Sequence, residues 1–469
     1  MSINILGLSL GLASCLICYL HLSYELGYDD FHENEESIYR VITGDIEEDD
    51  YWVMMAAPVP PVLKQEFPEV EEYVRMAYIS WDPKILVKHR EKVFNEKNFF
   101  LVDPSFFTIF NYKLILGDPH TALSTTDGLV ITESNAKKYF GDEDPLGKEI
   151  EVNGEFLFRV TGVIEDAPHN SHLDYTFLAS FENLSKAFGD NASKSWGGYN
   201  YFAYVKIVPN SDIPALRTKI RDYSFQATED RLVSFEDLDL QAINDIHFMS
   251  NRGNLKPAYN MTYIYIFWAL SIALLVIASI NYINLSIAHS ERRIREVAIK
   301  KVAGATRLQV VIQFMTETLF YTFVSMGLAL LLLRLTLPFL NRLFENRITL
   351  DFSTPGYLYV LMGITLVTGV IAGSYISFFV SRFRPTLILK GTIKIRTGDI
   401  NLRKALLFIQ FMVVSALLIC SFTIRSQLLY IQKIDLGLEK EDVIDVLIFD
   451  EDAKKKIPLL KQEILKSSL

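Results

Sequence analysis

The segment closest to a known catalytic motif is 141–149, which reads Gly-Asp-Glu-Asp-Pro-Leu-Gly-Lys-Glu. A phosphate-binding loop has a similar pattern of glycines followed by lysine. Here the two glycines are separated by one residue too many, and Glu149 stands where a magnesium-binding Ser or Thr belongs. Pro145 and Gly147 favour a surface turn instead. The sequence therefore predicts neither a nucleotide site nor ATP hydrolysis in this chain.

Two histidines, His169 and His172, have the spacing of a metal-binding pair. No third ligand accompanies them, and the neighbouring Pro168 and Asn170 favour a turn rather than a helix that carries ligands. We therefore expect no metal-binding, catalytic or cofactor-binding residue in the chain.

Segment 291–304 follows a long apolar run and mixes basic with apolar residues. Its apolar residues fall on one stripe at helical spacing: Ile294, Val297, Ala298 and Val302. Gly304 is suited to end this helix, and Thr306 and Gln309 have the spacing of a capping box that starts the next one. The pattern predicts an amphipathic helix at a membrane face. It is equally consistent with docking of a cytoplasmic partner and with adsorption to anionic lipid.

Small or amide-bearing residues at helical spacing occur in three apolar segments. Glycines four positions apart allow helices to approach closely in lipid, and asparagines on one face can hydrogen-bond between helices. The residues concerned are Gly7, Gly11, Asn281, Asn284, Gly369 and Gly373. They are candidates for helix packing, either static or in a moving or dimerising interface.

Five segments are long and apolar enough to cross a bilayer, which requires about 20 mostly apolar residues. They are 3–24, 261–288, 309–338, 354–380 and 405–428. The first lacks the basic start and the small-residue cleavage site of a signal peptide, which favours a membrane span. The missing basic start is equally consistent with a chain that begins inside a longer N-terminus.

The distribution of charge predicts how these spans are oriented. The links 289–308 and 381–404 are rich in Lys and Arg, whereas 25–50 holds eleven acidic residues and one base, Arg40. By the positive-inside rule the basic links face the cytoplasm, so 25–258 and 431–469 lie outside. The net charge of −10 argues against nucleic acid as a partner.

Residues 25–258 form a polar insertion long enough for a folded domain. Strand-like runs at 38–42, 128–132, 156–164 and 201–208 are mixed with helical stretches at 61–66, 134–140 and 213–222. None of the three cysteines lies in this region, so no disulfide framework is available to it. We therefore expect a membrane protein with an α-helical transmembrane bundle and a large α+β extracytoplasmic domain inserted between its first and second spans.

Several motifs occur along the chain in a characteristic combination. They are Tyr24-Glu-Leu-Gly-Tyr-Asp29 with Phe31-His-Glu-Asn34, Tyr139-Phe-Gly141 with Pro145-Leu-Gly-Lys148, Ser171-His-Leu173, Ile280-Asn-Tyr-Ile-Asn-Leu-Ser286, and Arg295-Glu-Val-Ala-Ile-Lys-Lys-Val-Ala-Gly304. Together they resemble the MacB/FtsX-like ABC transporter permease family, of the type common in Bacteroidetes. Arg403-Lys-Ala405 and Asp435-Leu-Gly437 are similar to the start of the family's second repeat, within which we expect this chain to be truncated.

The resemblance implies that 25–258 is a MacB-like periplasmic core domain and that the chain is a permease subunit in the cell inner membrane. It implies that a separate cytoplasmic ABC ATPase uses ATP, while this chain binds no cofactor. The ATPase-coupling segment would comprise Arg295, Glu296, Val297, Ile299, Lys301, Val302 and Gly304. Motion there would be transmitted to the periplasmic domain, a mechanism termed mechanotransmission.

The implied partners are the ATPase, membrane lipid, a second copy or a second repeat that forms a dimer or pseudo-dimer, and a periplasmic adaptor with an outer-membrane channel. Export or extraction of an unknown substrate is one hypothesis for the function. The alternative is a regulatory or antimicrobial-peptide-sensing protein without net transport. A membrane-anchored enzyme would require a pocket with converging titratable groups, which the sequence does not reveal.

Overall fold

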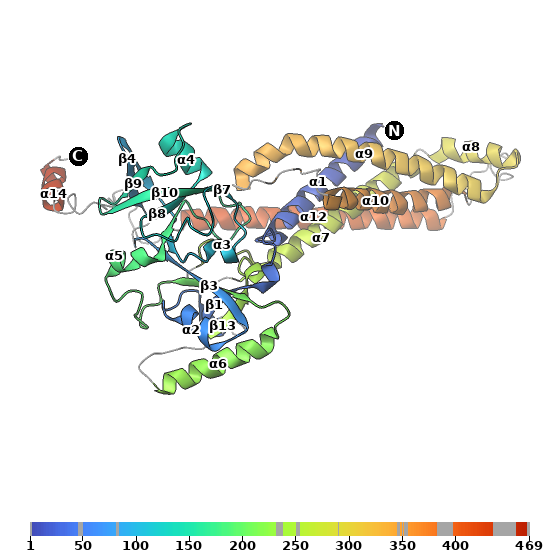
Figure 1. The fold of residues 1–469 in the computed structure, drawn as a ribbon. Coiled ribbons are helices and arrows are strands. Elements are labelled where there is room, and N and C mark those ends of the chain that lie inside the picture. Colours follow the sequence, from blue (N-terminus) through green and yellow to red (C-terminus); the bar gives the residue numbers. More distant parts are fainter. Residues whose placement is uncertain are drawn as a thin grey trace. The chain divides into compact units, whose positions relative to one another are not determined.

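The computed structural model describes residues 2–45, 50–80, 84–230, 238–249, 254–288, 290–344, 348, 350, 355–381, 397–434 and 456–466. Its contacts divide the chain into two compact units (Figure 1). A helical unit comprises Met1–Leu26 and Thr262–Val443, and a sheet unit comprises Gly27–Met261 and Ile444–Leu469. The expected cytoplasmic linker 381–404 and second periplasmic region 431–469 lie largely outside the described residues.

The helical unit contains six described helices. They are α1 (Ser2–Leu26), α7 (Met261–Ala288), α8 (Ser290–Val302), α9 (Arg307–Phe344), α10 (Pro355–Ser381) and α12 (Thr397–Lys433). Within the described residues, all of these except α8 are long and apolar enough to cross a membrane. An α-helix suits these segments because it satisfies every backbone hydrogen bond internally, as a bilayer demands.

Helix α9 holds the helical unit together, because it packs against both α1 and α10 (Figure 1). Leu8 and Leu12 of α1 share one buried cluster with Phe314 and Ala329 of α9 and Ala372 of α10. Helix α12 differs from the others, since no residue of its apolar window is buried against the described chain. Such a helix needs no protein partner to be stable, because lipid solvates its side chains.

The sheet unit contains thirteen described strands and several short helices. The strands are β1 (Ile38–Asp45), β2 (Asp50–Trp52), β3 (Val70–Tyr78), β4 (Ile85–His89), β5 (Lys92–Glu96), β6 (Phe99–Val102), β7 (Leu114–Leu116), β8 (Gly128–Thr132), β9 (Glu149–Val152), β10 (Phe156–Ile164), β11 (Phe177–Ser180), β12 (Phe202–Ile207) and β13 (Leu238–Ala242). The helices are η1 (Glu35–Ser37), α2 (Val59–Glu66), α3 (Phe106–Ile109), α4 (Glu133–Phe140), η2 (Phe181–Asn183), α5 (Leu184–Phe188), α6 (Ile213–Asp230), η3 (Ile243–Asp245) and α14 (Ile457–Lys466).

All thirteen strands belong to one mixed sheet with the order β13-β1-β12-β3-β6-β11-β8-β10-β9-β4-β5. Strand β2 pairs with β1, and β7 pairs with β10. Two neighbouring pairs, β6–β11 and β8–β10, are parallel. The sheet thus joins the first strand of the unit, β1, directly to its last described strand, β13, through an antiparallel pairing.

Both faces of the central strands are buried, which explains their continuous apolar runs. Alternate residues of β6 enter different cores, since Phe100 belongs to one cluster and Phe99 to another. The same alternation occurs in β11 with Leu178 and Phe177. Because successive side chains of a strand point to opposite faces, helices must cover both sides of such a sheet.

The elements agree with the α+β domain that the sequence predicts. Strands β1, β8, β10 and β12 lie at the four predicted strand-like runs, and helices α2, α4 and α6 lie at the three predicted helical stretches. The protein is therefore an α-helical membrane protein with a large α+β domain inserted between its first two apolar helices.

Candidate functional site

Helix α8 and the turn that follows it are shaped by local sequence signals. Gly304 has a φ of +101°, which a residue without a side chain adopts without strain. Its N–H donates to the carbonyl of Lys301 at 3.1 Å, which ends the helix. Thr306 and Gln309 form the predicted capping box: the Gln309 N–H donates to Thr306 Oγ1 at 3.3 Å, and the Thr306 N–H donates to Gln309 Oε1 at 2.8 Å.

The α8 stripe predicted from the sequence is only partly correct. Val297 and Ala298 are buried within the helical unit, but Val302 is 63% exposed. Ile299 is 66% exposed, so Ile299 and Val302 are the exposed apolar side chains among the residues of α8 whose side chains the structure describes. The burial of Val297 is a tertiary effect, since it joins the same cluster as residues of α9 and α10. The side chains of Ile294 and Arg295 lie outside the described residues.

Polar contacts fix α8 to its neighbours. Lys301 Nζ donates to the carbonyl of Ser381, the last residue of α10, at 2.6 Å. Lys300 forms an ion pair with Glu296 at 2.7 Å and a hydrogen bond with Gln313 of α9 at 3.0 Å. Hydrogen bonds and packing together therefore attach α8 to α9 and α10.

More apolar side chains are exposed at the start of α9. Leu308 is 67% exposed and Ile312, one turn further along, is 56% exposed. Together with Ile299 and Val302 of α8, these two side chains place exposed apolar groups on both helices that flank the Gly304 turn.

The four candidate glycines lie at helix contacts of different closeness. A Cβ atom at Gly11 would come within 2.3 Å of the Ala278 Cβ, and one at Gly7 within 3.1 Å of Asn281 Nδ2, so α1 touches α7. A Cβ at Gly369 would come within 2.7 Å of Leu319, and one at Gly373 within 3.0 Å of Met315, so α10 touches α9. At Gly11 an added side chain requires helix separation, whereas the groups nearest the other three glycines are the ends of flexible side chains, which can shift.

Asn284 differs from Asn281. Its side chain is buried, and neither its Nδ2 nor its Oδ1 has a hydrogen-bond partner among the described residues. A different pair of residues hydrogen-bonds between α1 and α7: Asn4 Nδ2 donates to Ser286 Oγ at 3.2 Å.

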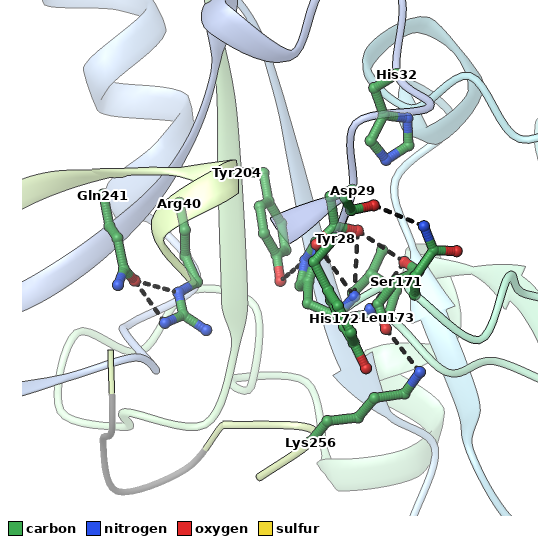
Figure 2. Close-up of polar contacts among 12 residues, drawn as sticks. Tyr28, Asp29, His32, Arg40, Ser171, His172, Leu173, Tyr204, Gln241 and Lys256 are labelled. Carbon is green, nitrogen blue, oxygen red and sulfur yellow. Dashed lines mark hydrogen bonds and ion pairs between the residues drawn. The ribbon is translucent and has the colours of Figure 1, made fainter. Parts of the chain in front are cut away.

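A buried polar network in the sheet unit joins two motifs that are far apart in the sequence (Figure 2). Asp29 is fully buried, and its carboxylate accepts hydrogen bonds from Ser171 Oγ at 2.9 Å and from the backbone N–H of His172 at 3.1 Å. It also lies 2.9 Å from His172 Nδ1. The other ring nitrogen of His172 lies 2.9 Å from the hydroxyl of Tyr204 on β12.

The network continues into the sheet through Arg40, a buried base on β1. Its guanidinium hydrogen-bonds with Tyr204 and donates from Nε to Gln241 Oε1 of β13 at 3.0 Å. Sequence reasoning missed Tyr204 and Gln241. Arg40 was visible as a single base in an acidic stretch. It lies two residues from both Ile38 and Ile42, so it shares their face of the strand, and this alternation is the signal that it points inward.

The environment shifts the pKa values of several groups around this network. Burial by itself raises the pKa of Asp29, but the charge and hydrogen bonds of His172 and Ser171 outweigh burial and hold that pKa below its ordinary value. Burial lowers the pKa of His32 to about 4, although the charge of Asp29 acts in the opposite direction. Burial and the charge of Glu35 raise the pKa of Asp30 to about 6.

The two segments that come closest to catalytic motifs take part in local contacts within the described chain. Gly141 follows α4 with a φ of +65°, and Lys148 forms an ion pair with Glu143 across the turn. His172 is bonded to Asp29 and Tyr204, and no group of three or more potential metal ligands occurs among the described residues.

Comparison with known families assigns both units. Residues 1–223 match the MacB-like periplasmic core domain, and residues 268–386 match the FtsX-like permease C-terminal domain. The chain belongs to the MacB/FtsX-like permeases. It is accordingly a multi-pass membrane protein with a periplasmic domain.

Individual relatives are distant. The chain is 22% identical over 270 residues to the macrolide export ATP-binding/permease protein MacB of Bdellovibrio bacteriovorus, covering 56% of this chain and 38% of the relative. It is 22% identical to the Pasteurella multocida protein of the same name, covering 61% and 42%. The chain thus spans about two fifths of the length of the curated relatives that it matches.

Two solved structures have local similarity to this chain. A domain of a putative permease protein from Porphyromonas gingivalis shares 23% identity, with a TM-score of 0.38 over 50% of this chain and 99% of that chain. The periplasmic region of MacB from Actinobacillus actinomycetemcomitans shares 15% identity, with a TM-score of 0.34 over 46% of this chain and 94% of that chain.

Proposed function

We propose that this permease couples ATP hydrolysis by a separate cytoplasmic ABC ATPase to motion of its periplasmic domain, and that it serves export or extraction of a substrate in the cell inner membrane. The family supports the presence of an ABC ATPase partner. The observation that carries the proposal is the exposed apolar pair Ile299 and Val302 on a helix whose other side is fixed to α9 and α10. Such a helix can receive force on one side and deliver it on the other.

The proposal extends to partners that the family relationship suggests. A second copy or a second repeat would complete a dimeric permease, and the exposed α12 offers apolar surface for lipid or for such a copy. A periplasmic adaptor and an outer-membrane channel would complete an export pathway.

The test of the docking function is a pair of double substitutions in the full chain. Both I299D/V302D and I299K/V302K place charges on the exposed side of α8 without touching the buried Val297. We expect each variant to insert into the membrane normally and to lower the permease-dependent stimulation of the co-purifying ATPase by about tenfold or more, because buried apolar anchors dominate interface energy.

The two charges separate docking from lipid adsorption. If α8 only lay on anionic lipid, the Lys variant would retain its function and the Asp variant alone would lose it, since cationic residues favour that surface. A double substitution of two exposed side chains in the apolar part of α9, F320A/F323A, serves as the matched control. Unchanged stimulation in both charged variants would contradict docking through α8.

A further inference from the structure

The loop of residues 169–172 between β10 and β11 contacts the first residues of the sheet unit, which follow α1 directly. The Asp29 N–H donates to the Asn170 carbonyl at 2.9 Å, and Asn170 Nδ2 donates to the Gly27 carbonyl at 2.6 Å. The Tyr28 hydroxyl donates to the His169 carbonyl at 3.1 Å. All three residues of the first segment, 27–29, are thus hydrogen-bonded to this loop.

The same loop contacts the last residues of the unit, which precede α7. Lys256 Nζ donates to the Ser171 carbonyl at 2.6 Å and to the His169 carbonyl at 3.4 Å (Figure 2). Burial lowers the pKa of Lys256, although the charges of Asp174 and Asp29 act in the opposite direction. The last segment, 254–259, therefore contributes a partly desolvated amine to the loop backbone.

A stack of rings connects the two segments a second time. The ring of Tyr28 lies flat on that of His247, with centroids 3.5 Å apart and an interplanar angle of 3°. The ring of His247 also lies near that of Tyr259 in the last segment, and the Tyr259 N–H donates to the His247 carbonyl at 2.7 Å. The contact between residues near positions 28 and 247 does not depend on the loop, so the two segments are held at two points.

The loop itself is anchored in the sheet by the Asp29–His172–Tyr204 network. These side chains are buried, so their hydrogen bonds face little competition from water. Removing one member of a buried hydrogen-bonded pair leaves the other without its partner, which is far more costly than losing a surface contact. The anchor is therefore a firm attachment of both segments to β12 and β1.

We propose that loop 169–172, together with Asp29 and Lys256, is a clasp that holds the first and last segments of the periplasmic domain as one load-bearing unit. Because of the clasp, displacement of either α1 or α7 moves β1 and β12 as one body. Without it, the same displacement would only bend the segment that connects that helix to the sheet. This inference rests on the proposed function for the origin of the force, but the clasp itself is a property of the folded domain. The load-bearing residues are positioning residues, not catalytic ones.

The test compares D29N and K256M in the full chain, reconstituted in lipid nanodiscs with the co-purifying ATPase. D29N removes the charge that faces Ser171 and His172, and K256M removes the amine while keeping the apolar stem. The matched control is D103N, which removes a similarly buried carboxylate that accepts bonds from Arg75 at 2.8 Å and contacts neither segment. Hydrogen exchange is followed in segments 27–34 and 254–259 and in strands β6 and β11.

The clasp predicts reciprocity. D29N should raise the rate of backbone amide hydrogen exchange about tenfold or more in segment 254–259 as well as in segment 27–34. K256M should raise the exchange rate of segment 27–34 by a similar factor. In both variants the amides of β6 and β11 should keep their protection. D103N should leave both segments protected. ATPase stimulation should fall in D29N and K256M but not in D103N when equal amounts of folded protein are compared.

Three other outcomes are decisive. If each variant loosens only its own segment, the two segments are not held together and the clasp is refuted. If exchange is reciprocal but stimulation is unchanged, the connection exists and carries no force, which overturns the inference. If the wild-type chain stimulates no ATPase, the proposed function fails, and the exchange pattern alone then decides whether the clasp exists.

Discussion

At the scale of single residues, Asp29 combines two features that cost free energy with one that offsets them. Its φ of +61° and its complete burial are unfavourable, whereas the hydrogen bonds around it favour its charged form. Aspartate tolerates the left-handed region better than most residues, but such a conformation persists only where the surroundings hold it. Those surroundings are Ser171 and His172, which the chain supplies from a loop more than a hundred residues away.

His32, three residues along, makes folding of the periplasmic domain sensitive to acid. The unfolded chain takes up a proton on this histidine near its ordinary pKa of 6.5, whereas the folded domain does so only near 4. The unfolded state therefore binds more protons between these values, and stability falls as the pH is lowered through this window. The full loss attributable to His32 is about 3 kcal/mol.

We expect the variant H32Q to lack this loss. Urea-dependent pulse proteolysis of the full chain, at several pH values from about 7 to about 4, should show wild-type stability falling more steeply than that of the variant. Asp30 acts in the opposite direction, because its raised pKa of about 6 makes the folded state gain a proton first, but it is present in both proteins. Parallel curves would show that His32 is not responsible.

At the scale of elements, close helix contacts in the membrane depend on glycines, which have no side chain to hold the helices apart. Gly11 lies where α1 meets α7, and a Cβ there would collide with Ala278. Gly363 of α10 has no atom within 4 Å of the position that its Cβ would occupy. The two glycines therefore make a matched pair, because the same added methyl group meets a neighbouring helix at one site and open space at the other.

The substitution Gly11→Ala should lower the stability of the helical unit by about 1–3 kcal/mol, the usual cost of overpacking. Gly363→Ala should be neutral or slightly stabilising, because alanine has the higher helix propensity. Thermal inactivation of the purified full chain in mild detergent measures both. Equal effects at the two positions would show that α1 and α7 separate without cost.

The spacing of residue types along the sequence predicted the helices and strands well, but it could not predict which faces of these elements pack against one another. The capping box of Thr306 and Gln309 lies within four residues, so the sequence alone specifies it. The sequence assigns Val297 and Val302 to one apolar stripe, but Val297 is buried in a cluster with residues of α9 and α10 while Val302 is exposed. Asp29 and His172 are 143 residues apart, and no periodicity connects them.

At the scale of the whole molecule, alternation of the spans predicts which side of the membrane each segment occupies. A reporter fused after Asn153 should be periplasmic, because that residue lies in an exposed turn of the periplasmic domain. A reporter fused after Gln309, beyond one further span, should be cytoplasmic. Alkaline phosphatase, active only outside the cytoplasm, and green fluorescent protein measure the two positions. The reverse pattern would overturn the orientation and place α8 out of reach of any cytoplasmic ATPase.

The hydrogen bond between Asn4 and Ser286 joins residues 282 positions apart, and this separation has a consequence for biosynthesis. A ribosome delivers α1 to the membrane long before α7 and α9 exist. During that interval the surfaces of Leu8, Gly11 and Leu12 have only lipid as a neighbour. The periplasmic domain, synthesised in between, can complete its own contacts first, as domains usually do during translation. Assembly of the membrane bundle is therefore a late event. A variant that delays export of the periplasmic domain should lengthen the time for which α1 is unpaired in the membrane, and should thereby make the chain more prone to degradation by membrane proteases.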